Sequence, residues 1–518
     1  MIGGSPRAIG STTRATAKLG EPLSEPDPAA PIRVPGRKSV QDYIDETPRW
    51  PDGTAAASVP LTRMQWRIWS LAAAGKFFEG MIVFMTGVAL PLIAAEFDMN
   101  AVQRGMVGAA SLFGILVGAL ALGGLADRFG RKAMFIVEMM IFTVFLVLLA
   151  ASPSYLWLIV CLFGVGVALG CDYPTAHLII SESIPSMARG RLVLAAFAFQ
   201  AVGVLTGTAI GYLVLANRPD LEAWRLMYVV AIIPALLVAL GRFFITESAP
   251  WLFAHGRVGE AAEQTRRLLR RDPPYPTEIT LSMPVAHPRR EGSYRALFSP
   301  PYRRATILAS VPWFIQDLST YGIGIFTPTV LAAAIGHQSQ KAHNLASLIH
   351  NDILAAEGAA FVDTLLLVGI FAAILLTDRL GRIPMQIIGF IGCAAGLLLA
   401  SFSLDYTGAT RGLLLFGGFM LFNFMTNFGP NAQTYLLAGE LFPTRIRGKG
   451  AGFAAAFAKM GAVLTAFLFP ILLVDIGTKA LLFGLVAASL LGALVTYLFR
   501  IETTGLNLEK LEAEKPGY

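Results

Sequence analysis

Hydrophobic residues form long runs along this chain. Twelve apolar segments are present, each close to or beyond the roughly 20 residues that a helix needs to cross a bilayer. The first six cover Trp66–Ala95, Ala101–Ala126, Ala133–Ala151, Tyr155–Ile184, Leu192–Ala216 and Leu226–Ile245. The second six cover Ala305–Ala334, Phe361–Thr377, Met385–Phe402, Leu413–Leu441, Gly450–Val474 and Ala480–Leu498. The pattern predicts an all-α membrane protein with twelve transmembrane helices.

The polar intervals divide this pattern into parts. Residues 1–63 are rich in Pro, Ser, Thr, Ala and charge and lack the apolar core of a signal peptide, so we expect a disordered cytoplasmic tail. Residues 64–246 and 304–500 are predicted six-helix bundles, 247–303 a cytoplasmic central loop and 501–518 a second cytoplasmic tail. Glycine and proline are expected to interrupt two of the helices, around Gly170 and Pro174 and around Gly429 and Pro430.

Composition excludes several classes of protein. The chain is 55% hydrophobic and only 14% charged, with a mean hydropathy of +0.61, whereas soluble chains carry about 25% charged residues. A soluble enzyme, a nucleic-acid binder and a secreted scaffold are therefore excluded, and the partners expected are a lipid bilayer and a small molecule. The three cysteines lie inside apolar runs and indicate no disulfide framework.

Lysine and arginine gather in the connections on one side of the predicted membrane. That side holds Arg128, Arg131, Lys132, Arg189, Arg191, Arg379, Arg382, Arg445, Arg447 and Lys449, and the other holds little beyond Arg218, Lys341 and Arg411. The positive-inside rule places the first side in the cytoplasm, so both termini are expected inside a plasma (cell inner) membrane. The Arg-rich central interval is interpreted as a positive-inside loop with one or two surface helices, or as a lipid-binding patch.

Three motifs recur at nearly one offset. Asp-Arg-x-Gly-Arg stands at 127–131 and 251 residues later at 378–382, and Glu-x-x-Pro-x-x-x-Arg-Gly stands at 182–190 and again at 440–448. Glu247 and Glu502 each follow one set of six segments. The two halves are therefore predicted to be parallel duplicates.

These paired motifs resemble the major facilitator superfamily over residues 64–512, and the motifs around Glu182, Glu247, Glu440 and Glu502 resemble its sugar-porter branch. The resemblance implies two parallel six-helix repeats that rock about a central site. It also implies that charged turns lock the halves together on the cytoplasmic side and gate access. The gating residues so implied are Asp127, Arg128, Arg131, Glu182, Arg189, Asp378, Arg379, Arg382, Glu440 and Arg447.

Among the charged residues inside the apolar segments, five stand out: Lys76, Glu79, Asp172, Asp317 and Lys459. Charge inside a membrane helix is costly, so each is a candidate for function. Lys76 and Glu79 are three residues apart, so they are interpreted either as functional or as a self-neutralising local pair. Asp172 is interpreted as functional or as part of a capped helix break.

Aromatic and amide residues accompany these charges. Trp313, Asp317 and Tyr321 are spaced by four and share one helical face. Gln200 is interpreted either as a ligand contact or as a helix-packing amide. Together with Asn431, these groups predict a polar binding site assembled from both halves.

The stretches 170–174, 313–317 with Tyr321, 381–390 and 429–445 resemble the proton-coupled phosphate symporters. The substrate contacts that this resemblance implies are Asp172, Tyr173, Gln200, Trp313, Asp317, Tyr321, Asn431 and Lys459. The proton-coupling residues that it implies are Glu79, Asp172 and Asp317.

We therefore expect a monomeric secondary transporter, not an enzyme, that carries a small anion with protons. Inorganic phosphate is the first expectation, and an organic anion such as a sugar acid or aromatic acid, or a sugar or polyol, is the alternative. A non-transporting nutrient receptor is a further alternative, but it would need a long soluble tail. No cofactor, metal ion or nucleic acid is expected.

Overall fold

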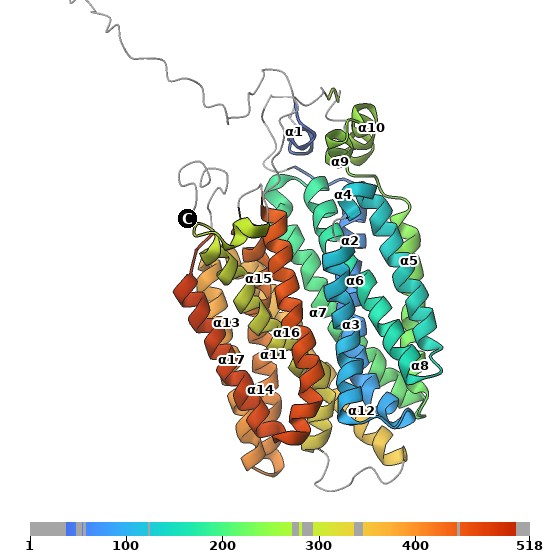
Figure 1. Ribbon diagram of the computed structural model, residues 1–518, viewed down its shortest axis with the longest axis vertical. Helices are drawn as coiled ribbons and strands as arrows, with labels where there is room; N and C mark the ends of the chain where they lie inside the picture. Colours follow the sequence, from blue (N-terminus) through green and yellow to red (C-terminus); the bar gives the residue numbers. More distant parts are fainter. Residues whose placement is uncertain are drawn as a thin grey trace, which may run out of the picture. The chain divides into compact units, whose positions relative to one another are not determined.

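The computed structural model describes residues 38–47, 54, 59–122, 125–271, 279–281, 294–335, 345–442 and 446–503. For some residues inside its helices it describes the backbone alone. These ranges contain helices and no strand. Figure 1 shows long helices that run side by side, with the first half of the chain in blue and green and the second in yellow to red.

The helix bounds agree with most of the predicted segments. The first half consists of α2 (Arg63–Glu96), α3 (Ala101–Leu122), α4 (Leu125–Phe129), α5 (Arg131–Ala150), α6 (Tyr155–Ser183), α7 (Ser186–Asn217) and α8 (Ala223–Arg242). The second half consists of α11 (Arg303–Ile335), α12 (Leu345–Leu380), α13 (Arg382–Phe402), η2 (Ser403–Asp405), α14 (Gly408–Phe428), α15 (Pro430–Glu440), α16 (Arg447–Asp475) and α17 (Gly477–Phe499).

Eleven spans within the described residues are long and apolar enough to cross a membrane. The remaining long helix is α11, which has 33 residues but buries Gln316, Asp317 and Ser319 in its middle. Such polar residues are tolerated in a membrane helix where the helix faces protein rather than lipid. The prediction of an all-α membrane bundle is confirmed.

The two expected helix interruptions have different outcomes. The tenth segment breaks at Gly429, which lies between α14 and α15. The fourth segment is continuous through Gly170 and Pro174, because α6 runs unbroken from Tyr155 to Ser183. A Cβ on Gly170 would collide with the backbone of Ile115 in α3, so this glycine permits close helix packing and does not break the helix.

The predicted N-terminal tail and the central interval also contain helices. Within the range expected to be disordered, α1 (Val40–Ile44) forms with a capping box at Ser39. Asp45, just after α1, accepts a 2.7 Å hydrogen bond from the backbone N–H of Ser186 at the start of α7. This part of the predicted tail is ordered because a capped turn meets the exposed start of a long helix. The central interval forms α9 (Ala249–Ala254), α10 (Val258–Leu268) and η1 (Tyr294–Phe298).

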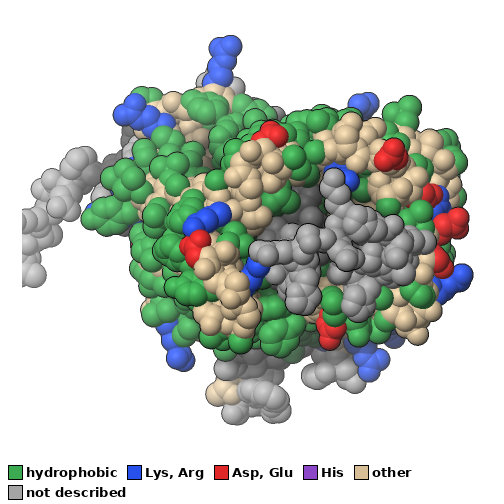
Figure 2. Space-filling model, turned by 90° about the horizontal axis from the view of Figure 1, so that it is seen from below, with side chains coloured by type: hydrophobic (Ala, Val, Ile, Leu, Met, Phe, Trp, Pro, Cys, Tyr) green, Lys and Arg blue, Asp and Glu red, His purple; other side chains and the backbone are tan. Residues whose placement is uncertain are grey.

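The bundle has two distinct ends. We call the end that carries Arg131 and Arg382, with α1, α9 and α10, the arginine end; it is uppermost in Figure 1. Figure 2 shows the opposite end, where hydrophobic side chains predominate and charged side chains are scattered. The half-exposed pair Lys479–Asp405 joins the start of α17 to η2 at this opposite end.

The two halves contact each other through α3 and α16, α7 and α12, and α2 and α11. Near the opposite end, a Cβ on Gly105 would collide with the backbone of Phe467, and one on Gly87 with that of Ile325. Backbones approach this closely only where a side chain is absent, as in other membrane bundles. The halves are therefore closed against each other at the opposite end.

Helix packing within the first half predicts a stability effect. A Cβ on Gly166 would fall inside van der Waals contact with the backbone carbonyl of Ser111 in α3. We expect Gly166→Ala to destabilise the protein by about 1–3 kcal/mol through overpacking, measured as a lower thermal midpoint in detergent. Gly417→Ala is the control, since no atom lies near its added Cβ. An equal midpoint for both variants would contradict the close α3–α6 approach.

Candidate functional site

A cluster of buried charges lies where α2, α11 and α16 meet. Lys76 and Glu79 occupy one face of α2, and Asp317 and Tyr321 occupy one face of α11. Lys459 of α16 completes the cluster, and all five side chains are buried. Three separate helices therefore bring the charges predicted from the sequence into one place, with the exception of Asp172.

Lys459 connects the two halves at this cluster. Its Nζ lies 3.3 Å from Glu79 Oε1 and 3.2 Å from Asp317 Oδ2. It also donates a 2.7 Å hydrogen bond to the Tyr321 hydroxyl, which in turn donates to Glu79 Oε1 at 3.0 Å. Lys76 Nζ binds the other oxygen of Glu79 at 3.0 Å. The local Lys76–Glu79 pair considered from the sequence exists, but Glu79 also binds across the two halves.

The cluster is formally neutral. Lys76 and Lys459 contribute two positive charges, and Glu79 and Asp317 contribute two negative charges when ionised. Buried ions are tolerated only when they are paired, because their desolvation costs several kcal/mol each. A proton gained by either acid would leave one positive charge in excess at this point.

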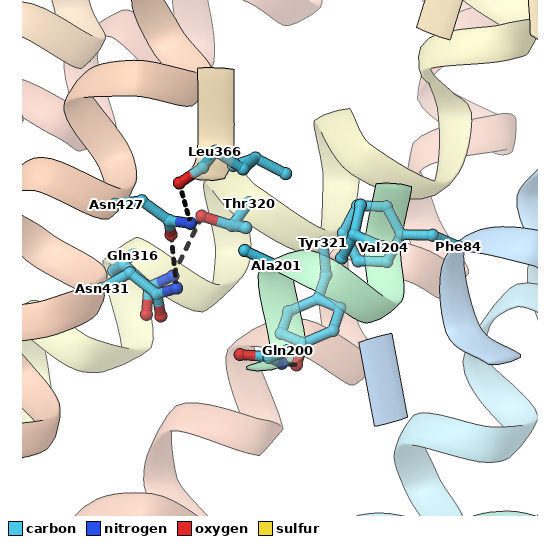
Figure 3. Close-up of a pocket in the computed structure, with 10 residues that line it drawn as sticks. All are labelled: Phe84, Gln200, Ala201, Val204, Gln316, Thr320, Tyr321, Leu366, Asn427 and Asn431. Carbon is cyan, nitrogen blue, oxygen red and sulfur yellow. Dashed lines mark hydrogen bonds between the residues drawn. The ribbon is translucent and has the colours of Figure 1, made fainter. Parts of the chain in front are cut away.

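Beside the charge cluster lies a small cavity. Its lining is shown in Figure 3 and comprises Phe84, Gln200, Ala201, Val204, Gln316, Thr320, Tyr321, Leu366, Asn427 and Asn431. The polar side chains of Gln316 and Thr320 (α11), Asn427 (α14) and Asn431 (α15) lie on one side of the cavity. Phe84 of α2 and Val204 of α7 lie on the other side. None of these ten residues is charged.

Hydrogen bonds hold the amides of the cavity in place. Asn431 donates to Asn427 Oδ1 at 2.7 Å, and Asn427 donates to the carbonyl of Leu366 at 3.0 Å. Gln316 donates to Thr320 Oγ1 at 3.0 Å. The helix break at Gly429 lies between Asn427 and Asn431, and irregular backbone beside a cavity is typical of binding sites in membrane proteins.

Gln200 and Tyr321 connect the cavity to the charge cluster. Gln200 Nε2 donates a 3.0 Å hydrogen bond to the Tyr321 hydroxyl, and both residues line the cavity. Because the same hydroxyl contacts Glu79 and Lys459, a ligand that binds Gln200 or Tyr321 would disturb the hydrogen bonds of both charges. This is a short physical route between a bound solute and a titratable group.

The remaining predicted contacts lie elsewhere. Trp313 packs edge-on against Tyr435, which stacks on Phe197 with the rings 4.4 Å apart. Tyr435 lies one turn of α15 beyond Asn431, toward the arginine end. The side chain of Tyr173 lies outside the described residues.

Asp172 lies in a second charge cluster, within the first half. Its Oδ1 lies 2.6 Å from Arg242, and Arg242 also lies 2.8 Å from Glu138. Arg242 is fully buried and stacks over Phe135, with its guanidinium carbon 3.4 Å from the ring centroid. Asp172 is thus paired with Arg242 rather than with Lys459, and its carboxylate also lies against Gly75 of α2, next to Lys76.

Several functional candidates were missed by the sequence analysis. Glu138 and Asp363 are charged residues inside predicted apolar segments, which is the same signal that identified Asp317. Gln316, Thr320 and Asn427 line the cavity, but uncharged polar residues are common in packed membrane helices and gave no distinct signal.

The repeated motifs form matching networks in the two halves. Arg131 pairs with Glu182 at 3.2 Å, and Arg382 pairs with Glu440 at 3.4 Å. Glu247 accepts the backbone N–H of Arg131 at 3.0 Å, as Glu502 accepts that of Arg382 at 3.1 Å. Ser248 and Thr503 donate to Glu182 and Glu440 respectively. The duplication predicted from the spacing is thus a duplication of contacts.

These contacts differ from the expected gate, since each joins helices of the same half. Arg131 and Glu182 both belong to the first half, and Arg382 and Glu440 both belong to the second. Arg189 lies 3.5 Å from Ser186, Arg128 lies beside Phe129, and Arg379 is exposed. The side chains of Asp127, Asp378 and Arg447 lie outside the described residues.

Comparison with known proteins identifies the family. Residues 61–514 match the family described as "Sugar (and other) transporter". The inner membrane metabolite transport protein YgcS of Escherichia coli is 30% identical over 459 residues, which cover 87% of this chain and 94% of the relative. A candidate inorganic phosphate transporter of Schizosaccharomyces pombe, C1683.01, is 26% identical over 519 residues. The match covers 87% of this chain and 88% of the relative.

A solved structure has the same fold. The proton:xylose symporter XylE of the major facilitator superfamily, bound to 6-bromo-6-deoxy-D-glucose, superposes with a TM-score of 0.69 at 20% identity. The match covers 87% of this chain and 99% of that chain. The chain therefore belongs to the sugar (and other) transporter family of multi-pass membrane proteins and has the major facilitator fold.

Proposed function

We propose that this protein is a proton-coupled symporter of a small, uncharged organic solute that carries hydroxyl groups, such as a sugar or polyol. The observation that carries the proposal is the uncharged lining of the cavity beside a charge-balanced cluster. The family to which the chain belongs includes sugar transporters by its description, which supports the same class of solute.

The chemistry of the cavity favours such a solute over phosphate. Amide groups such as Gln316 and Asn431 offer both donors and acceptors, which suits hydroxyl groups that need both. Phe84, Val204 and Leu366 offer apolar surface to the carbon skeleton. Phosphate has no apolar face, and Lys459 is already bound by Glu79, Asp317 and Tyr321. Phosphate, the first expectation from the sequence, thus becomes the second candidate.

The coupling proton is proposed to bind at Glu79 or Asp317. Both acids are buried, both contact Lys459, and Glu79 is one hydrogen bond from a cavity-lining hydroxyl. A solute that engages Gln200 and Tyr321 would weaken the hydrogen bond to Glu79 and so favour its protonation. Each of the two, proton and solute, would then raise the affinity for the other, which is the coupling that symport requires. Asp172 is proposed to stabilise the first half through Arg242 and not to carry the proton.

One observation favours the second candidate, a small anion such as phosphate. Protonation of one acid in the neutral cluster leaves one excess positive charge, which a monovalent anion in the adjacent cavity would balance. An anion would then enter with its proton. The charge-balanced variant described below separates this case from the neutral solute.

The arginine end is proposed to face the cytoplasm, on the positive-inside rule. The paired networks of Arg131 and Arg382 would then hold each half rigid at this end while the halves rock as units. We propose that a monomer carries out transport, since one chain supplies all the residues of the cavity.

Substitution of the proposed proton acceptor tests the coupling. Glu79→Gln is expected to abolish gradient-driven accumulation in proteoliposomes while solute exchange continues, because an amide neither binds nor releases the proton. Uptake of labelled xylose, glucose, myo-inositol, phosphate and organic acids is compared with and without an inward proton gradient. Glu96→Gln, the same change on the same helix at the far Arg225 pair, is the control and should accumulate normally. Normal accumulation by Glu79→Gln would exclude Glu79 as the coupling group.

The charge of the solute is tested by removing one charge of each sign. Lys459→Gln alone leaves two acids facing one lysine and is expected to cost about 3–5 kcal/mol of stability, so it is paired with Asp317→Asn. For a neutral solute, the double variant should bind within a few-fold of the parent. For an anion, loss of the charged partner should weaken binding by about 1.5–3 kcal/mol, roughly ten- to a hundredfold. Phosphate binding by the parent that collapses in the double variant would overturn the neutral-solute assignment.

A further inference from the structure

A buried acid outside the charge cluster lies between the two halves. Asp363 of α12 is 3% exposed and is inside a membrane-spanning helix. Its Oδ2 lies 2.9 Å from the hydroxyl of Thr208, which belongs to α7 in the other half. Its Oδ1 accepts a 3.1 Å hydrogen bond from Asn423 of α14. None of these three residues belongs to the cavity lining or to the proposed coupling group.

The hydrogen bonds of Thr208 indicate the protonation state of Asp363. The Thr208 hydroxyl also lies 3.0 Å from the backbone carbonyl of Val204, which can only accept. A hydroxyl has one hydrogen, so it cannot donate to both the carbonyl and a carboxylate. Both contacts are hydrogen bonds if Asp363 carries a proton on Oδ2 and donates to Thr208, which then donates to Val204.

The charge environment leads to the same conclusion. The elements packed against α12 are α2, α7, α11, α13 and α14. Their described charged side chains lie in the charge cluster (Lys76, Glu79, Asp317), at the arginine end (Arg63, Arg67, Arg189, Arg191, Arg303, Arg304, Arg382), or near the opposite end (Glu96, bound to Arg225, and Arg411). On α12 itself, Glu357 and Arg379 are exposed.

Within the described residues, none of these groups forms an ion pair with Asp363, whose carboxyl oxygens are hydrogen-bonded to the neutral Thr208 and Asn423. An ionised carboxylate without a counter-charge is costly in a membrane interior, whereas a protonated one with both oxygens hydrogen-bonded is not.

The position of Asp363 gives this proton a mechanical consequence. Asp363 and Asn423 lie one turn beyond Leu366 and Asn427 of the cavity, away from the arginine end. The same side of the cavity is where the halves are closed against each other, at Gly87 and Gly105. The Asp363–Thr208 hydrogen bond therefore crosses the closed interface between α7 and α12.

We propose that Asp363 is a second proton-binding site, which holds a proton while the opposite end is closed and releases it to water when α7 and α12 separate. The proton leaves the carboxyl oxygen as the hydrogen bond to Thr208 breaks, and the resulting carboxylate is hydrated in the open cavity. Because the closed state holds the proton, low pH favours closure of this end and high pH favours opening. The proposal rests on the proposed opening and closing of a transporter but not on the identity of its solute.

Infrared spectroscopy of the purified protein in lipid tests the proton directly. We expect a carboxylic acid C=O band that disappears as the pH is raised, and we expect this band to be lost in Asp363→Asn but retained in Glu357→Gln. Glu357 is an exposed acid on the same helix and is therefore a matched control. An unchanged band in Asp363→Asn would show that Asp363 is ionised and would overturn the proposal.

The coupling of this proton to closure is tested by the distance between spin labels at Asn217 and Leu354, which are exposed residues of α7 and α12. We expect the distance to lengthen as the pH rises, and we expect this shift to be lost in Asp363→Asn, where the amide maintains the short distance. Thr208→Val keeps the acid but removes its partner, so it should show the long distance already at low pH. A full pH-dependent shift in either variant would overturn the proposal. Neither measurement requires a transported solute, so failure here leaves the proposed symport to be judged separately.

Discussion

Neutralisation of buried charge is the constraint on which the rest of this structure depends. A charge in the membrane interior is stable only if another charge, a proton or several hydrogen bonds compensate it, and the partner must come from a neighbouring helix. Lys459 bound by Glu79 and Asp317, and Arg242 bound by Asp172 and Glu138, meet this requirement in different ways. The first cluster joins the two halves, whereas the second joins α5, α6 and α8 within one half.

In the proposed rocking of the two halves, this difference separates the contacts that would change from those that would not. Arg242 makes its ion pairs inside one half, so its cluster is unaffected when the halves move relative to each other. The Lys459–Glu79 contact and the Asp363–Thr208 contact cross the interface and must change when the halves separate. Contacts that change between states are the ones through which proton binding can shift a conformational equilibrium. The position of an acid relative to the interface thus decides whether it can take part in coupling.

The close approach of helices is the second requirement for such contacts. Glycines such as Gly87 and Gly105 allow the backbones of the two halves to meet at the opposite end. A hydrogen bond as short as that between Asp363 and Thr208 across α7 and α12 requires the same closeness. Small residues and buried polar residues therefore act together, because glycines let the helices come close enough for the polar side chains to form hydrogen bonds.

The sequence by itself determined the class of the fold, the helix bounds to within a few residues for most segments, and the duplication of the two halves. These features depend on local hydropathy and on motif spacing, which can be read along one chain. It also identified Glu79, Asp317 and Lys459 as functional candidates, because charge inside an apolar segment is a local signal, and Tyr321 by its spacing from Asp317. The tertiary structure alone decided which residues meet. The periodicity of α6 shows the face on which Asp172 lies, but not that this face meets Arg242 rather than Lys459. In the same way, Asp363 and Asn427 acquire their roles only from the packing of α12 against α7 and α14. Partner choice depends on how helices from distant parts of the chain pack, and one sequence read by its local pattern does not contain that information.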